Sequence, residues 1–383
     1  MKLLFATLLI HRDVDTFIFN WFCSRINLDN GFSIPHLIVN DGTLTPEDLE
    51  KLHRLTNVIV EETPVEVYNN VPKAKYLAKI KLFEKGFMKY DADRVVILDP
   101  DVFFYRPWDG DLNNILLHDN TAIMDFGSSL GPNLERYEKL FQVKRDVLTP
   151  TCNTGLVSTI RANWPKLQSA LITHLSEPFL VMEDQAICFK AFWHDLFYHQ
   201  GIRLCLNGAN TADSLWQWFL QQNGAHLVGM RTRPDEYNKL VNHTLSLLPE
   251  SIHPSRFEYH EYIVPGGVSN EYGFYNFDHM AAYPSAVNGM YVTDAIYLSG
   301  NSSIKWKLPP QIKTFECSVF ALDNGNAKAP ISINGENVQI GQFAIVKVIG
   351  ELNIKSQPGD RTFYALTNPK LKFEVIKPTM KFE

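Results

Sequence analysis

The sequence predicts an α/β domain built on a central mixed sheet, followed by an all-β domain with a sandwich or jelly-roll architecture. In the first hundred residues, short apolar runs alternate with helical stretches, and Val95–Leu98 resembles a strand buried on both faces. After Tyr283-Pro284, short alternating runs separated by Gly, Pro, Asn and Asp replace the helical periodicity. A single core rarely grows to 383 residues. We therefore expect domains at 1–284 and 285–383.

The expected elements of the first domain alternate along the chain. Strands are predicted at Leu3–Ile10, Pro35–Asn40, Asn57–Val60 and Val95–Leu98, and helices at Asp13 to about Ile26, from Thr45 onward and at Lys73–Lys89. Thr45 can cap its helix, and Pro46 suits the first turn. This order implies parallel strands with right-handed crossovers. No glycine-rich phosphate loop follows the first strand, which disfavours a dinucleotide fold or a P-loop.

Two carboxylates follow the fourth strand directly. Asp99 and Asp101 flank Pro100, which prevents a helical turn. They therefore stand at the carboxyl end of a central strand, where open α/β sheets bind ligands. Such close carboxylates repel each other unless positive charge lies nearby, and a magnesium or manganese ion carrying diphosphate oxygens meets that need. The alternative is a turn in which Asp99 caps backbone amides and Asp101 is solvated.

The helix Lys73–Lys89 is rich in lysine and runs into the Asp-x-Asp strand. Lys75 and Lys79 share one face of it, at i and i+4, so one of them could reach a diphosphate. A solvated basic face is the alternative interpretation.

Composition limits the partners and the compartment. The net charge of -6 argues against a nucleic-acid surface. Five scattered cysteines without C-x-x-C spacing suggest neither a zinc site nor a disulfide framework, and favour reduced thiols in the cytoplasm. The apolar opening Lys2–Ile10 is too short to span a bilayer, so we expect no transmembrane segment.

Several motifs together resemble one enzyme family. The runs Ala78–Phe83 and Val95–Val102 look like the helix and the metal-binding strand of glycogenin-like and bacterial lipopolysaccharide-type glycosyltransferases of the GT-A fold. Further pieces follow in the family's order: Asp125 after the strand Ala122–Met124, then Cys152–Val157, Met182–Ile187 and Glu236–Asn238. The resemblance covers roughly residues 1 to 265 and implies a GT-A-like nucleotide-sugar-binding domain.

The resemblance also implies roles for individual residues. It assigns contacts with the donor sugar to Asp125, Asn153, Asp184 and Gln185, with Asp184 or Gln185 nearest the anomeric carbon. It implies that a divalent cation on Asp99 and Asp101 holds the donor diphosphate, with Lys79 adding positive charge. We count Lys79, Thr7, Leu8, Asp99 and Gly155 as donor-binding residues. A UDP-sugar donor, a carbohydrate or glycoconjugate acceptor and a retaining outcome are expected on the same basis.

The residue chemistry can be considered without the family. Gly155 has no Cβ and allows close backbone approach to a ligand, while the amide of Asn153 can hydrogen-bond sugar hydroxyls. A turn before a buried strand is the alternative. Asp184 and Gln185 fall in the first turn of an apolar helix, where the dipole favours a carboxylate, so Asp184 could also be a plain helix cap.

The family pattern breaks down near its end. There, a His followed by a Gly and a Lys-Pro-Trp supplies the third metal ligand and a diphosphate-binding lysine. The candidates here are His253 and His260, neither followed by Lys-Pro-Trp. We favour His260, because it lies in a strand-like run that leads to Pro265-Gly266-Gly267.

The remaining stretches indicate less about function. Ser214–Gln222, with Trp216 and Trp218, predicts a helical insertion whose aromatic rings could stack on sugars or cover a hydrophobic patch. The second domain should contain strands at Met290–Leu298, Ile304–Leu308, Glu316–Leu322, Ala329–Ile333, Asn337–Ile340, Phe343–Val348, Leu352–Ser356, Thr362–Leu366 and Leu371–Val375. Its architecture suits sugar binding and equally a structural or homo-oligomerising role.

These observations favour a metal-dependent glycosyltransferase that moves a hexosyl or pentosyl group. A sugar-phosphate nucleotidyltransferase also uses carboxylates and a divalent ion, but normally has a glycine-rich loop after the first strand. A non-catalytic sugar-binding protein is the third hypothesis.

Overall fold

The computed structural model describes residues 1–62, 74–126, 138–139, 142, 150–176, 183–205, 213–257, 261–263, 285–287, 290–292, 295–299, 303–321, 329–356 and 363–380. The chain forms two compact units: one holds residues 1–53, 57–248 and 377–383, and the other holds 54–56 and 249–376. The expected boundary after residue 284 adjoins a stretch, 264–284, that lies outside the described residues, and it stays a prediction.

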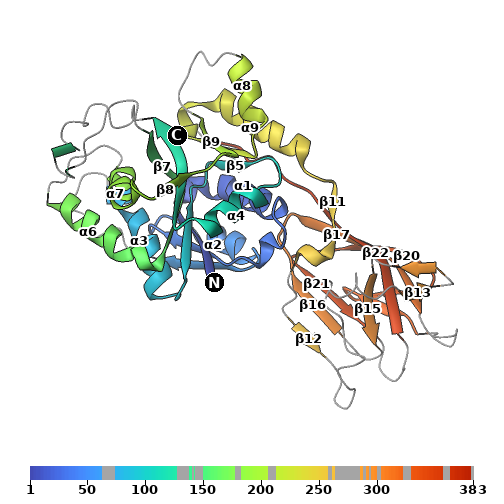
Figure 1. The fold of residues 1–383 in the computed structure, drawn as a ribbon. Coiled ribbons are helices and arrows are strands. Elements are labelled where there is room, and N and C mark those ends of the chain that lie inside the picture. The colour runs from blue at the N-terminus through green and yellow to red at the C-terminus, as the bar shows by residue number, and fades with distance from the viewer. Residues whose placement is uncertain are drawn as a thin grey trace. The chain divides into compact units, whose positions relative to one another are not determined.

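The first unit is organised around a seven-stranded sheet of order β3-β2-β1-β4-β7-β6-β8. Figure 1 labels β7 and β8 of this sheet, with α3, α6 and α7 nearby. Its strands are β1 Leu3–Leu9, β2 His36–Asn40, β3 Val58–Glu62, β4 Arg94–Leu98, β6 Asn120–Phe126, β7 Pro150–Ile160 and β8 Leu196–Tyr198. The first four strands are parallel to one another. Strand β7 runs antiparallel to β4 and β6, and β8 is parallel to β6. The predicted mixed sheet is confirmed.

A small second sheet lies in the same unit. It consists of β5 Val102–Phe104, β10 Gly224–Leu227 and β9 Ile202–Cys205, in the order β5-β10-β9. Strand β10 is antiparallel to β5 and parallel to β9. The register pairs His226 with Val102, so this histidine lies beside the residue that follows Asp101.

Helices connect these strands. The α-helices are α1 Val14–Ile26, α2 Pro46–His53, α3 Ala74–Met88, α4 Asp109–Leu117, α6 Trp164–Leu175, α7 Glu183–Phe192, α8 Asp213–Leu220 and α9 Pro234–Leu247. Short 3-10 helices are η1 His11–Asp13, η2 Gly31–Ser33, η5 Arg161–Asn163, η6 Met230–Thr232 and η7 Pro254–Arg256. Thr45 caps α2 as predicted: the Asp48 N–H donates to the Thr45 hydroxyl at 3.2 Å, and the Thr45 N–H donates to the Asp48 carboxylate at 2.8 Å.

Strand β4 is buried on both faces, as its apolar run predicts. Val95 and Ile97 belong to a core cluster that includes residues of α3, α6 and α7. Val96 and Leu98 belong to a second cluster that includes Trp108. All four strand residues are buried. The end of this strand is therefore held rigidly from both sides.

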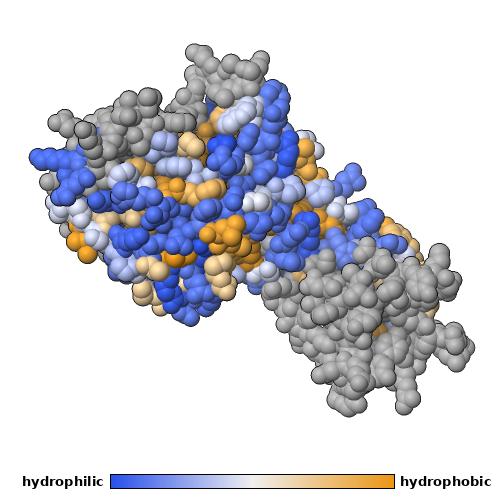
Figure 2. All heavy atoms as spheres, viewed as in Figure 1, coloured by the Kyte–Doolittle hydropathy of each residue, from blue (hydrophilic) through white to orange (hydrophobic). Residues whose placement is uncertain are grey.

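The surface of the first unit is mostly hydrophilic on the face seen in Figure 2, with separate hydrophobic patches. In the part of the chain that the structure describes, no helix combines the length and the apolar character that crossing a membrane requires.

The second unit consists of antiparallel sheets, as expected for a β-sandwich. One sheet has the order β11-β22-β17-β20, with β15 also paired to β22; another has the order β12-β16-β21-β18-β19; β13 and β14 form a pair. The strands are β11 Ser251–Ile252, β12 Glu261–Ile263, β13 Ser285–Val287, β14 Met290–Val292, β15 Ala295–Ser299, β16 Ser303–Lys307, β17 Ile312–Ala321, β18 Ile331–Ile333, β19 Glu336–Val338, β20 Phe343–Lys347, β21 Glu351–Lys355 and β22 Phe363–Phe373. Burial alternates along β20, which gives it one buried and one exposed face.

Three of the strands expected in this unit have the wrong bounds. Met290–Leu298 is not one strand, because β14 and β15 pair with different partners. Conversely, the strands expected at Thr362–Leu366 and Leu371–Val375 are parts of the single strand β22. Asn368-Pro369 lies at a bulge rather than at a turn: Asn368 has a φ of 49°, and the register with β17 shifts there.

Glu61 of β3 connects the sheet with the end of α3 and the residues that follow it. Its carboxylate accepts a hydrogen bond from Lys85 at 2.9 Å and others from Lys89 and Tyr90. Burial would raise the pKa of Glu61, but Lys89, Tyr90 and Lys85 outweigh it and lower that pKa to about 2. These contacts stabilise the folded protein at pH values above the pKa that Glu61 has in the unfolded chain, and this stabilisation is lost as pH falls toward 2.

We expect Glu61→Gln to lower the free energy of unfolding by about 1–2 kcal/mol at pH 7, after allowance for solvent screening. The difference from wild type should shrink as pH falls from about 4.5 to about 3. Urea denaturation across that range measures both values, with Glu47→Gln as the exposed control. A deficit that does not change with pH would contradict the prediction.

Candidate active site

The Asp-Pro-Asp turn at the end of β4 is fixed by backbone hydrogen bonds. The N–H of Asp99 donates to the carbonyl of Gly155 at 2.7 Å, and the N–H of Val102 donates to the carbonyl of Asp99 at 3.2 Å. The side-chain amide of Asn20 donates to the carbonyl of Pro100 at 2.8 Å. The two carboxylates are therefore held by β7 and α1 as well as by their own strand.

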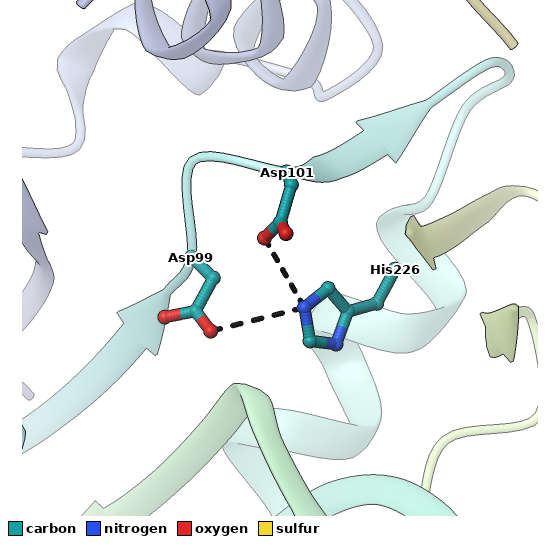
Figure 3. A group of neighbouring side chains, drawn as sticks. All are labelled: Asp99, Asp101 and His226. Carbon is teal, nitrogen blue, oxygen red and sulfur yellow. Dashed lines mark ion pairs between the residues drawn. The ribbon is translucent and has the colours of Figure 1, made fainter. Parts of the chain in front are cut away.

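Asp99, Asp101 and His226 offer ligand atoms that all lie within 4.8 Å of one another. The Nε2 atom of His226 lies 3.1 Å from Oδ1 of Asp101 and 3.8 Å from Oδ2 of Asp99 (Figure 3). The N–H of Leu227 donates to the carbonyl of Asp101 at 3.0 Å, which ties the end of β10 to the turn before β5. Two carboxylates and one imidazole are a donor set that fits a divalent cation such as manganese.

The electrostatics of this cluster favour added positive charge. Burial raises the pKa of Asp99 above its usual range, and the nearby Lys79 and His226 only partly offset that effect. Burial would lower the pKa of His226, but Asp101 and Asp99 outweigh it and raise that pKa. The first shift comes from burial of the Asp99 carboxyl and the second from the negative charges beside the imidazole, so a bound cation would be favoured at both places.

Lys79 connects Asp99 with Asp184. Its ammonium nitrogen lies 2.7 Å from Oδ2 of Asp99 and 3.2 Å from Oδ2 of Asp184. Burial would lower the pKa of Lys79, but the two carboxylates raise it, so the side chain stays charged. The side chain of Lys75, the alternative candidate, lies outside the described residues.

Asp184 and Gln185 begin α7 and present buried acceptor atoms. They are only 2% and 7% exposed, yet Asp184 Oδ1 and Gln185 Oε1 have no hydrogen-bond partner among the described residues. The hydroxyl of Thr154 donates to the other oxygen of Asp184. Buried acceptors are normally satisfied, so these two atoms are suited to a ligand that supplies hydroxyl donors.

A cleft of 430 Å³ joins these groups. Lys79, the Asp-Pro-Asp turn, Asp184 and Gln185 line it, together with Leu8, Ile10, Asp41 and the segment 228–232. The cleft lies at the carboxyl ends of β1, β2 and β4, where the fold class predicts a binding site. Its volume is within the range of small-molecule sites.

Other predicted site residues have different surroundings. Leu8 lines the cleft, but Thr7 is buried below it and donates its hydroxyl to the carbonyl of Leu98 at 2.7 Å. Asp125 is buried in β6, opposite Thr151, and does not belong to the cleft lining described above. Thr7 therefore supports the end of β4 from within the core.

Asn153 lines the cleft, whereas Gly155 makes room for another side chain. A Cβ atom on Gly155 would lie 2.2 Å from Nδ1 of His226. The space that the missing side chain leaves is filled by this imidazole, not by an approaching ligand as we expected from the sequence.

The third candidate metal ligand was missed in the sequence. His260 lies outside the described residues, and His253 belongs to the second unit. The group that the described residues form contains His226 instead. The sequence contains a pattern that points to His226: Gly229 follows it after two residues, and in the family a Gly also follows the metal-binding histidine. No Lys-Pro-Trp follows Gly229; Arg231 lies two residues after it, and its guanidinium pairs with the Asp13 carboxylate at 2.6 Å.

Comparisons with known proteins gave structural matches only. No family model matches the chain, and no curated protein matches it. The galactosyltransferase LgtC, in complex with donor and acceptor sugar analogs, is 15% identical at a TM-score of 0.47, covering 64% of this chain and 98% of its own. The bifunctional glycosyltransferase WbbM is 14% identical at 0.47, covering 64% and 50%. Mouse xyloside xylosyltransferase 1 is 11% identical at 0.40, covering 60% and 98%.

The assignment of His226 can be tested by metal binding. We expect His226→Ala to weaken Mn²⁺ binding more than about tenfold, because loss of a residue that merely orients a ligand already costs about 10–100-fold. Isothermal titration with MnCl₂ measures the affinity. His253→Ala is the control and should bind as wild type does. Equal binding by both variants would contradict the assignment.

Proposed function

We propose that this chain is a glycosyltransferase that moves a sugar from a nucleotide-diphosphate sugar to an acceptor hydroxyl, with the help of a divalent cation. One observation carries the proposal. The cleft combines three candidate metal ligands and a half-buried lysine with two buried acceptors that have no partner among the described residues. The metal ligands and the lysine suit a diphosphate, and the two acceptors suit a sugar. Diphosphate and sugar are the two halves of a nucleotide-sugar donor.

The diphosphate half depends on Asp99, Asp101, His226 and Lys79. These residues would hold a manganese or magnesium ion, which when bound stabilises the charge that develops on the leaving diphosphate. Lys79 contributes a fixed positive charge beside Asp99. It is held on both sides by carboxylates, so it needs little reorganisation when the donor binds.

The sugar half depends on Asp184 and Gln185. Their free oxygens accept hydrogen bonds from sugar hydroxyls, while Thr154 fixes the orientation of the Asp184 carboxylate. We assign Asp184 to the position nearest the anomeric carbon. The resemblance in sequence motifs supports a retaining outcome, with a hexose or a pentose as the transferred group.

The nucleoside would occupy the end of the cleft formed by β1 and β2. Leu8 and Ile10 line it with apolar atoms, and Asp41 supplies carboxylate oxygens. The sequence resemblance supports UDP as the nucleotide and a carbohydrate or glycoconjugate as the acceptor. All five cysteines are free and buried, which supports a reducing compartment such as the cytoplasm.

A sugar-phosphate nucleotidyltransferase is less well supported. The residues that follow β1 are Ile10-His11-Arg12-Asp13, which contain no glycine, and His11–Asp13 form η1. A glycine-rich loop that cradles phosphates is therefore missing from the place where such enzymes normally carry it.

The decisive variant is Asp101→Asn, which keeps the shape of the side chain and removes a negatively charged ligand. We expect metal-dependent hydrolysis of the nucleotide sugar, the slow side reaction with water, to fall by about 100-fold or more. Release of nucleoside diphosphate from a panel of nucleotide sugars, with and without MnCl₂, measures it.

The exposed Asp119→Asn is the matched control and should retain full turnover. Thermal denaturation of both variants separates loss of function from loss of fold. Full activity of Asp101→Asn in the presence of a chelator would overturn the proposal.

A further inference from the structure

We propose that Asn153 is a positioning residue that holds the imidazole of His226 in one tautomer, with Nε2 turned toward the two aspartates. This inference deepens the proposed function because it concerns how the imidazole of the metal cluster is set. Only the bound ion depends on the proposed function, because the hydrogen bonds that set the tautomer are all made within the protein.

The Oδ1 atom of Asn153 accepts two hydrogen bonds. It lies 2.8 Å from the backbone nitrogen of Gly155 and 2.6 Å from Nδ1 of His226. The N–H of Gly155 can only donate, so the amide atom that faces it is the oxygen and not the nitrogen. An amide oxygen only accepts, and Nδ1 of His226 must therefore carry a proton.

The tautomer decides which ring atom faces the cluster. A neutral imidazole with its proton on Nδ1 has a lone pair on Nε2. This Nε2 lies 3.1 Å from Asp101 Oδ1 and 3.8 Å from Asp99 Oδ2 (Figure 3). A lone pair directed at two carboxylates is the arrangement that binds a shared cation. The opposite tautomer would direct an N–H there.

Gly155 fixes the position of the ring. A Cβ on this residue would lie 2.2 Å from Nδ1 and 2.4 Å from Cε1 of His226, distances that packed atoms do not reach. The imidazole therefore packs directly against the backbone of β7. Asn153, on the same strand, hydrogen-bonds the edge of the ring, and the side chains of Asn153 and His226 are both buried. Residues 153 and 155 thus act on one histidine.

This arrangement changes the role that we first gave to Asn153. The two hydrogen bonds from Gly155 and His226 fill both lone pairs of its amide oxygen. That oxygen has no remaining capacity to accept from a sugar hydroxyl. The positioning role follows from the geometry of the free protein, and a contact with the donor would have to use the amide nitrogen.

The test uses Asn153→Ala, Asn153→Asp and the matched control Asn163→Ala. Asn163 is also a buried asparagine, 6% exposed against 3% for Asn153, and its amide donates one hydrogen bond to Asn120. Long-range ¹H–¹⁵N spectra of the metal-free protein, at a pH where the ring is neutral, report the tautomer. The His226 signal is assigned as the one that is missing from the spectrum of the His226→Ala variant.

We expect the Nδ1-protonated tautomer in wild type, in Asn163→Ala and in Asn153→Asp, which keeps an oxygen acceptor. Asn153→Ala should show a mixture of tautomers. It should also bind Mn²⁺ about 10–100-fold more weakly by titration calorimetry, whereas the other two should stay within a few-fold of wild type.

The outcomes separate the two proposals. A wild-type His226 protonated on Nε2, or an Asn153→Ala variant with wild-type tautomer, would overturn the inference, and the first measurement needs no variant to fold. If wild type shows the expected tautomer but binds no Mn²⁺, the inference is supported and the ion of the proposed function is refuted. A wild-type-like Mn²⁺ affinity in Asn153→Ala would refute the claim that the tautomer matters for binding.

Discussion

The structure of the first unit depends on two negative charges placed close together at the end of β4. Val95–Leu98 is packed on both faces, and Asn20 fixes the turn at Pro100, where the chain reaches the cleft. Asp99 and Asp101 are thereby kept near each other, and burial raises the pKa of Asp99. Positive charge must offset them, and this need explains the positions of Lys79, which carries such a charge, and of His226, which can share a cation with them.

Each of those two groups is brought to the carboxylates by a different part of the fold. Lys79 comes from α3, the helix that precedes β4 and packs against the same sheet. Such a neighbour is expected from a βαβ unit, because the crossover helix returns across the strands that it connects. His226 comes from β10, which pairs with β5 in the second sheet. This pairing joins residues more than a hundred positions apart in the sequence.

That difference explains how much the sequence could predict. The alternation of elements, the buried strand Val95–Leu98 and the carboxylates after it depend on local patterns, and they appear as expected. Lys79 and the start of α7 at Asp184 are also local features of amphipathic helices. His226 depends on strand pairing that leaves no periodic signal, and one histidine in a short apolar strand resembles a core residue. Thr7 also has a partner distant in the sequence, because its hydroxyl donates to the carbonyl of Leu98 in the core.

Strand β7 links the two halves of the site through an irregularity in its pairing. Its register with β4 is regular, and Leu98 pairs with Leu156. Its register with β6 shifts, so that Ile123 pairs with Asn153 while Ala122 pairs with Val157. The residues between them, Thr154 to Leu156, have no partner in β6, as in a bulge.

A bulge redirects side chains that a flat strand would hold in fixed alternation. Here Thr154 turns its hydroxyl to Asp184, while the carbonyl of Gly155 receives the N–H of Asp99. Thr154 and Gly155 therefore fix a carboxylate of the sugar half and a carboxylate of the metal half. A regular β7 would have to give up one of these contacts to keep the other. The irregular pairing is what lets one strand serve both, which accounts for a threonine followed by a glycine at this point of a buried sheet.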